Sequence, residues 1–272
     1  MKIVTTIELF GEESRELDNN YYMMLKIWLH RLNIYASECD IELLYVNENQ
    51  GHKSNVLFYN DFKKFLSKYP NLKINILKVE QPDFDYTPRG RRRSLKHQQF
   101  FNNKIAILSQ KPPFIWMDID LFLFRPLKEF YQHLGEHPFV GTGHGSHTRG
   151  EKEKVQAGLY ILNKQNYIDI EVGLEECRRE AGDQAQHVCH DQGIINGFFR
   201  KTGKNPFVFE GHEYWNWHGM RCDFHKDGNE EFVRCTDIGG DEVFGCHFWG
   251  LQKPWRYPRT VPFWEDCVKR IV

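Results

Sequence analysis

Two acidic residues near the middle of the chain directly follow a short apolar run. Asp118 and Asp120 come after Phe-Ile-Trp-Met at 114–117. Residues two apart in an extended segment point to the same side, so both carboxylates can face one ion. Hard divalent cations prefer oxygen ligands, and such a cation can neutralise the charge of a departing diphosphate. The pair therefore predicts a site for Mn²⁺ or Mg²⁺ and a phosphate-bearing substrate.

A second Asp-x-Asp motif shows that this pattern alone is a weak signal. It occupies residues 83–85, between Pro82 and Pro88, and no apolar strand precedes it. Exposed carboxylates in a loop are the simpler interpretation of this copy. We therefore expect the metal at Asp118 and Asp120.

The segment 247–255 contains residue types that suit a diphosphate and its metal. His247 offers a nitrogen ligand, and Gly250 allows the backbone to approach a ligand closely. Lys253 offers a compact positive charge to the phosphates. A buried aromatic turn with an exposed lysine is the alternative interpretation of the same segment.

Positive charge is densest between residues 89 and 96. This cluster comprises Arg89, Arg91, Arg92, Arg93 and Lys96. A solvated loop leading into a helix explains such a cluster, but a basic surface also attracts a nucleotide diphosphate. On the second interpretation, Arg89 and Lys96 are the expected donor contacts.

Strands and helices alternate over the first 120 residues. Apolar and β-branched runs predict strands at 3–7, 41–46, 72–79 and 114–117, and three- and four-residue spacing predicts helices at 17–34, 58–69 and 95–108. Asp18 or Asn19 is the expected cap of the first helix. This order predicts an α/β fold with a central, mainly parallel sheet and helices on both faces. Ligands bind beyond the carboxyl ends of the strands in such sheets, which is where the acidic pair falls.

The second half of the chain is less regular. We expect strands at 139–142 and 159–162, helices at 167–181 and 192–199, and no long periodic element in the C-terminal 70 residues. No linker or repeat divides the sequence. We therefore expect one domain over 1–272, with a nucleotide-binding half at 1–120 and an acceptor-binding half at 121–272.

Composition narrows the class of protein further. The 36 Lys and Arg balance 37 Asp and Glu, for a net charge of -1, which argues against a nucleic-acid partner. No run of 18 apolar residues occurs, so we expect no integral membrane segment. Glu8 follows the first apolar run before the apolar region of a secretory signal could form, so we expect no such signal and a cytoplasmic protein. The seven Cys include no C-x-x-C, which favours reduced core thiols over a zinc knuckle or a redox dithiol.

The acidic strand and the C-terminal segment together resemble GT-A glycosyltransferases of the glycogenin-like, family 8 type. The resemblance rests on Phe-Ile-Trp-Met-Asp-Ile-Asp, followed near the C-terminus by His-x-x-Gly-x-x-Lys-Pro-Trp. Residues 191–196 resemble the family's Asp-Gln-x-x-x-Asn segment. Residues 155–162 stand where the family has an Asn-Ser-Gly-containing strand, with Gln156-Ala157 in place of Asn-Ser. These motifs occur in the same order as in the family, and together they cover nearly the whole chain.

The resemblance implies a metal-dependent transfer, with retention of configuration, from a nucleotide sugar, most simply a UDP-sugar. The acceptor would be a glycan, a lipid-linked molecule or a protein. The implied metal ligands, for a manganese-type ion, are Asp118, Asp120 and His247. The implied donor contacts are Thr5, Thr6, Asp118, Ile119, Gly250 and Lys253. Thr5 and Thr6 are equally well explained as plain strand residues.

Three further residues are expected to act on the sugar. Lys104 opens the helix before the acidic strand, where the family often has a donor-contacting lysine. Asp191 and Gln192 resemble the pair beneath the reacting sugar, where a carboxylate and an amide can stabilise positive charge and bind hydroxyl groups. Asp191 as a helix cap with Gln192 in the first turn is the alternative.

Other classes of function remain open from the sequence. A phosphatase or phosphotransferase of the haloacid-dehalogenase kind also carries Asp-x-Asp after an apolar strand, usually near the N-terminus. A non-catalytic module that binds nucleotide sugars or glycans is a second alternative. The aromatic segment 213–217 could also present stacking faces to an acceptor sugar, although aromatic residues are more often core.

Overall fold

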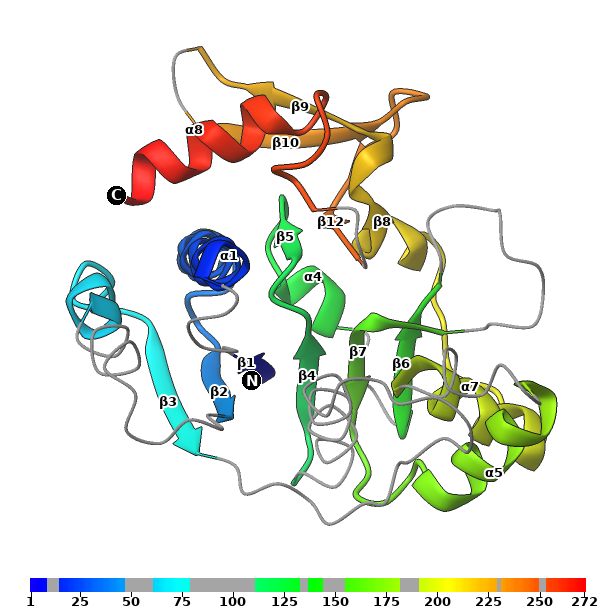
Figure 1. Ribbon diagram of the computed structural model, residues 1–272. Helices are drawn as coiled ribbons and strands as arrows, with labels where there is room; N and C mark the ends of the chain where they lie inside the picture. Colours follow the sequence, from blue (N-terminus) through cyan, green and yellow to red (C-terminus); the bar gives the residue numbers. More distant parts are fainter. Residues whose placement is uncertain are drawn as a thin grey trace.

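The computed structural model describes residues 1–8, 15–46, 61–78, 111–132, 137–143, 155–181, 191–228, 231–249 and 253–272. Within these ranges the main sheet has six strands in the order β3-β2-β1-β4-β7-β6 (Figure 1). Their bounds are β1 Lys2–Glu8, β2 Asp40–Val46, β3 Lys73–Lys78, β4 Phe114–Met117, β6 Phe139–Thr142 and β7 Gln156–Leu162. Strands β3, β2, β1 and β4 are parallel, and β7 is antiparallel to both of its neighbours. The predicted α/β fold with a mainly parallel sheet is confirmed.

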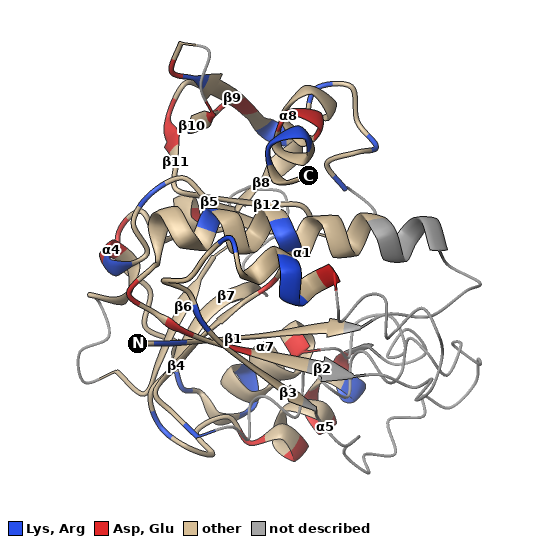
Figure 2. Ribbon diagram, turned by 90° about the vertical axis from the view of Figure 1, so that its left-hand side faces the viewer, with Lys and Arg blue, Asp and Glu red and all other residues tan. Residues whose placement is uncertain are grey.

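Helices cover both faces of this sheet. Figure 2 shows α1 (Arg15–Tyr35) and α8 (Val261–Ile271) on one side, and α5 (Ile170–Ala181) and α7 (Asp191–Thr202) on the other. Apolar residues fill both layers, so the central strands β1 and β4 are buried on both faces. The uninterrupted apolar sequence of β4 fits this position, and β1 adds the buried Thr5 and Thr6 to its apolar residues. Helices α5 and α7 approach so closely that a Cβ at Gly197 would lie 2.3 Å from the carbonyl oxygen of Gly173.

Two small sheets and a helix occupy the C-terminal part of the chain. One sheet is antiparallel and contains β9 Cys222–Lys226, β10 Phe232–Asp237 and β11 Glu242–Val243. The other contains β5 Leu121–Leu123, β12 Gly245–His247 and β8 Trp217–His218. Shorter helices complete the described fold at Lys128–Tyr131 (α4), His212–Trp215 (η3) and Gly219–Arg221 (η4).

The expectation that no long periodic element follows residue 200 is wrong. Helix α8 buries Phe263, Trp264, Cys267 and Ile271 at three- and four-residue spacing, and Pro262 lies in its first turn, where proline is favoured. The pattern is present in the sequence, but it spans only three turns.

Several predicted boundaries also change. Helix α1 begins at Arg15, so Asp18 and Asn19 lie inside it and neither is its cap. Strand β7 begins three residues before the predicted 159, and α5 begins at Ile170 instead of 167. Residues 61–66 of the predicted 58–69 helix are helical, whereas the predicted helix at 95–108 lies outside the described residues. None of the described helices is long and apolar enough to cross a membrane.

Candidate active site

Strand β4 leads directly into the candidate site. After Met117 the chain turns, with the Leu121 backbone N–H donating to the Asp118 carbonyl at 3.1 Å, and continues as β5. Strand β12 pairs antiparallel with β5 and places His247 opposite Leu121. The Phe248 N–H then donates to the Asp120 carbonyl at 2.9 Å. This pairing brings the C-terminal segment next to the acidic pair.

Asp118, Asp120 and His247 form a cluster with the chemistry of a metal site. His247 Nε2 lies 3.0 Å from Asp120 Oδ1 and 3.6 Å from Asp118 Oδ2. One ligand atom from each residue lies within 4.8 Å of the other two. Trp116 Nε1 donates to Asp118 Oδ1 at 3.1 Å and so fixes that carboxylate. Two carboxylate oxygens and one imidazole nitrogen fit a divalent ion such as Mn²⁺.

Lys253 lies against the same carboxylate. It is buried, its ammonium contacts Asp120 Oδ2, and it donates to the Phe248 carbonyl at 2.9 Å. Burial alone would raise the pKa of Asp120, but the charges of Lys253 and His247 hold that pKa well below its usual range. The described site therefore contains an ionised carboxylate that cationic side chains already neutralise. The predicted contact of Lys253 with a diphosphate stays a prediction.

His247 is oriented by a buried network on its other ring nitrogen. Nδ1 lies 2.8 Å from Asn216 Oδ1, while the Asn216 amide donates to Gln156 Oε1 and to Thr142 Oγ1. These donations identify Asn216 Oδ1 as an acceptor, and Gln156 Nε2 also lies 3.2 Å from Nδ1, while Nε2 faces the carboxylates. Although burial disfavours a charged imidazole, Asp120 and Asp118 raise the pKa of His247. Metal binding at Nε2 therefore competes with protonation of the ring.

Gly158 provides the space for the His247 ring. A Cβ at position 158 would lie 2.3 Å from His247 Cε1 and 2.5 Å from Nδ1, far inside normal contact. The Gly158 carbonyl accepts from the Asp118 N–H at 2.9 Å, and its own N–H donates to Gln156 Oε1 at 2.6 Å. Strand β7 thus touches both the acidic pair and the histidine.

The start of α7 is bonded to the same stretch of β7. Gln192 Oε1 accepts from the Ala157 N–H at 3.2 Å, one residue from both Gln156 and Gly158. Asp191 and Gln192 are both buried, and Asp191 is the first residue of the helix. Burial and the charges of Asp191 and Asp118 raise the pKa of Tyr160 well above its ordinary value. Asp118 and Asp191 therefore lie within electrostatic range of one tyrosine.

Thr5 and Thr6 lie within β1, not at its carboxyl end, because the strand continues to Glu8. Ile3 pairs with Ile115, a register that sets Thr6 level with Asp118. Thr5 is completely buried, and among the described residues its hydroxyl has no hydrogen-bond partner. Ile119 is half-buried against the main core.

Other predicted site residues lie outside the described part of the chain. These are Arg89, Lys96, Lys104 and Gly250, together with the second acidic motif at 83–85. Their roles stay predictions.

Sequence reasoning missed the residues that hold His247. In the segment 213–217, Trp215 and Trp217 are buried, and Tyr214 stacks on Trp217 with ring centroids 5.3 Å apart. The tryptophans of this segment are therefore core residues, and Asn216 between them makes the contact with His247. An isolated asparagine flanked by tryptophans is the only sequence signal of this role.

Comparison with solved structures identifies the fold as that of the GT-A glycosyltransferases. The galactosyltransferase LgtC, solved in complex with donor and acceptor sugar analogs, is similar over 100% of this chain and 95% of its own, with a TM-score of 0.59 and 18% identity. GlyE from Streptococcus pneumoniae TIGR4 is similar over 99% of this chain and 61% of its own, with a TM-score of 0.57 and 12% identity. Mouse xyloside xylosyltransferase 1 is similar over 91% of this chain and 97% of its own, with a TM-score of 0.54 and 12% identity. No protein-family model and no curated protein matches the sequence. At these identities the similarity shows the fold, and the predicted GT-A resemblance is confirmed at that level.

Proposed function

We propose that the protein is a glycosyltransferase that moves a sugar from a nucleotide-diphosphate sugar, most simply a UDP-sugar, to an acceptor hydroxyl. The observation that carries this proposal is the meeting of Asp118, Asp120 and His247 at the carboxyl end of β4 in a GT-A fold. Ligands bind beyond the carboxyl ends of strands in open α/β sheets. The donor diphosphate would therefore lie at this edge of the sheet.

Asp118, Asp120 and His247 would hold a divalent cation, with Mn²⁺ as the first candidate. When bound, the ion supplies positive charge that offsets the charge of the departing diphosphate. Trp116 fixes one carboxylate and Asn216 orients the imidazole, so the three ligands are held in position before an ion arrives. Lys253 forms an ion pair with Asp120 in the free protein. In the proposed complex, its ammonium would contact the diphosphate.

Asp191 and Gln192 would act on the sugar itself. The bond between Gln192 and the Ala157 N–H links the start of α7 to the stretch of β7 that supports His247. A carboxylate at this position stabilises positive charge that develops at the anomeric carbon, and Lys104 is our candidate for a further donor contact. We assign retention of configuration to this transfer, as the resemblance to family 8 implies.

The two alternative functions are separated from this proposal by their ligands. A haloacid-dehalogenase-like phosphatase would hydrolyse simple phosphate esters, and the GT-A fold argues against that class. A non-catalytic module would bind nucleotide sugars without transferring the sugar.

A panel of nucleotide sugars and phosphate esters, screened by thermal shift with Mn²⁺ or with EDTA, tests the proposal. We expect a nucleoside diphosphate or its sugar to raise the melting temperature only when Mn²⁺ is present. Asp120→Ala should abolish this shift, whereas Asp83→Ala, in the second acidic motif, should retain it. An equal loss in both variants, or a shift with phosphate esters alone, would contradict the assignment.

A further inference from the structure

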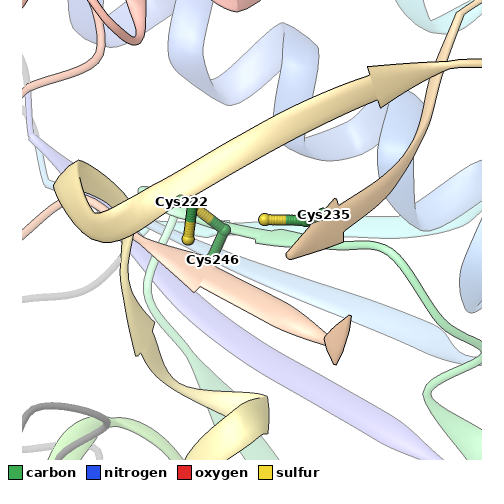
Figure 3. Close-up of side chains that lie close together, drawn as sticks. All are labelled: Cys222, Cys235 and Cys246. Atoms are coloured by element: carbon green, nitrogen blue, oxygen red, sulfur yellow. The ribbon is translucent and has the colours of Figure 1, made fainter. Parts of the chain in front are cut away.

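Three cysteines that are far apart in the sequence meet inside the C-terminal part of the fold. Cys222 begins β9, Cys235 lies in β10 and Cys246 lies in β12. All three are fully buried, and their sulfur atoms lie within 4.8 Å of one another (Figure 3). All three are free thiols in the core, as predicted, and they lie together.

Strand pairing explains the meeting of the first two. Asp237 is paired with Cys222, and Phe224 is paired with Cys235, so the two cysteines are diagonal neighbours on one face of the β9–β10 pair. Cys246 reaches them from the separate sheet that contains β5, β12 and β8. Because neighbouring residues of a strand point to opposite sides, His247 faces the acidic pair while Cys246 faces the other two cysteines.

The spacing of Cys222 and Cys235 disfavours a disulfide between them. Diagonal neighbours of an antiparallel pair lie about 7–8 Å apart, which is beyond the roughly 4.4–6.8 Å between Cα atoms that a disulfide spans. A shared metal ion does not require the sulfur atoms to come as close to each other as a disulfide does. Metal–thiolate bonds are about 2.3 Å long, so two sulfurs on one ion can be up to about 4.6 Å apart. Sulfur atoms that lie within 4.8 Å of one another are consistent with this limit.

The surroundings of the cluster select a soft ion. Among the described residues, no carboxylate or imidazole joins the three sulfurs, in contrast to the oxygen-rich cluster at Asp118 and Asp120. Thiolates prefer soft ions such as Zn²⁺ and Cu⁺ over Mg²⁺ or Mn²⁺. The two clusters therefore differ in ligand chemistry and should not compete for the same metal.

A buried cation, Arg31, lies near the cluster; it is paired with Glu231 and would offset part of the charge of metal-bound thiolates. Arg31 donates to the carbonyl of Phe232 in β10 at 2.8 Å and to the carbonyl of Leu123 in β5. Leu123 is paired with Gly245, the neighbour of Cys246.

We propose that Cys222, Cys235 and Cys246 bind one soft metal ion, Zn²⁺ or Cu⁺, as thiolates. The ion ties β9 and β10 to β12, the strand that carries His247 on its opposite side. This site is independent of the proposed glycosyl transfer, because it needs neither a nucleotide nor the acidic pair.

The test uses protein that is reduced and purified without oxygen, in the wild-type and Asp120→Ala forms. Asp120→Ala removes an expected ligand of the other cluster, so an ion that both forms bind equally is held elsewhere. We expect Co²⁺, as a spectroscopic probe, to produce one equivalent of thiolate-to-cobalt charge-transfer absorption in both forms. Zn²⁺ or Cu⁺ should then displace it, and the ion that displaces it at the lower concentration identifies the preferred metal.

Two cysteine variants provide the matched comparison. Cys235→Ala should bind the ion at least about tenfold more weakly, whereas Cys177→Ala, which removes a buried cysteine of α5, should bind it as wild type does. If Cys235→Ala does not fold, the wild type still decides, because bound ion must also raise its unfolding midpoint. Absence of thiolate absorption in the wild type, or formation of a disulfide in place of metal binding, would overturn the proposal.

Discussion

Gly158→Ala is expected to disable the metal site without removing any ligand. The added methyl would lie 2.3 Å from His247 Cε1, whereas carbon atoms in ordinary contact are roughly 3.5 Å apart. The ring must therefore move by about 1.2 Å, while metal–ligand distances tolerate only about 0.2 Å. Changes to groups that merely orient a ligand already weaken metal binding by about 10- to 100-fold. We expect a loss of Mn²⁺ affinity of at least that size.

Mn²⁺ titration followed by electron paramagnetic resonance measures this loss, and near-ultraviolet circular dichroism checks the fold. Gly141→Ala is the matched control, because the nearest atoms to its Cβ belong to Val155, just before β7, at 3.0 Å and to Phe139 of its own strand at 3.2 Å, and not to His247. Unchanged Mn²⁺ affinity in a folded Gly158→Ala protein, together with lost affinity in His247→Ala, would refute the reasoning. It would mean that the ring moves to another position from which it still binds metal.

Three further variants test separate parts of the account. Lys253→Ala should weaken UDP binding by about 10- to 150-fold, since bonds to charged groups contribute about 1.5–3 kcal/mol, and added Mn²⁺ should not restore it in calorimetry. His247→Ala should instead be rescued in part by high Mn²⁺, and the reverse pattern would mean that the two roles are exchanged. Glu231→Gln should lower the free energy of unfolding by about 1–3 kcal/mol at pH 7. His30 and Arg31 hold the pKa of Glu231 below its ordinary value despite burial, so its contribution is present above the unfolded pKa of about 4.3 and is lost as the pH falls below it. Denaturation curves at several pH values should therefore show wild type and variant converging in acid, and a constant difference would exclude this cause.

The described elements of the first 120 residues are largely predictable from the sequence because they are long and periodic. Strands β1, β2, β3 and β4 are apolar or alternating runs, and α1 carries a clear apolar face. Asp118 and Asp120 are recognisable because the carboxyl end of a buried strand is where such sheets bind ligands. Family resemblance added His247, and the β5–β12 pairing brings it next to the pair.

The C-terminal part is less predictable because its strands are short and its contacts are set by tertiary packing. Strands β8 and β11 have two residues each, too few for any periodic pattern. The support of His247 by Asn216, and the meeting of Cys222 with Cys246, depend on how β12 packs against neighbours from elsewhere in the chain. Sequence spacing carries no information about these contacts.

The release of UDP from a UDP-sugar panel, measured with purified protein and a mixed acceptor panel, tests the central claim most directly. We expect this release to require Mn²⁺, to stop in EDTA and to return when Mn²⁺ is added back. We also expect a loss of orders of magnitude in Asp120→Ala and little change in Asp83→Ala. Full activity in EDTA, or equal activity in Asp120→Ala and wild type, would contradict the claim that Asp118, Asp120 and His247 hold the metal for glycosyl transfer.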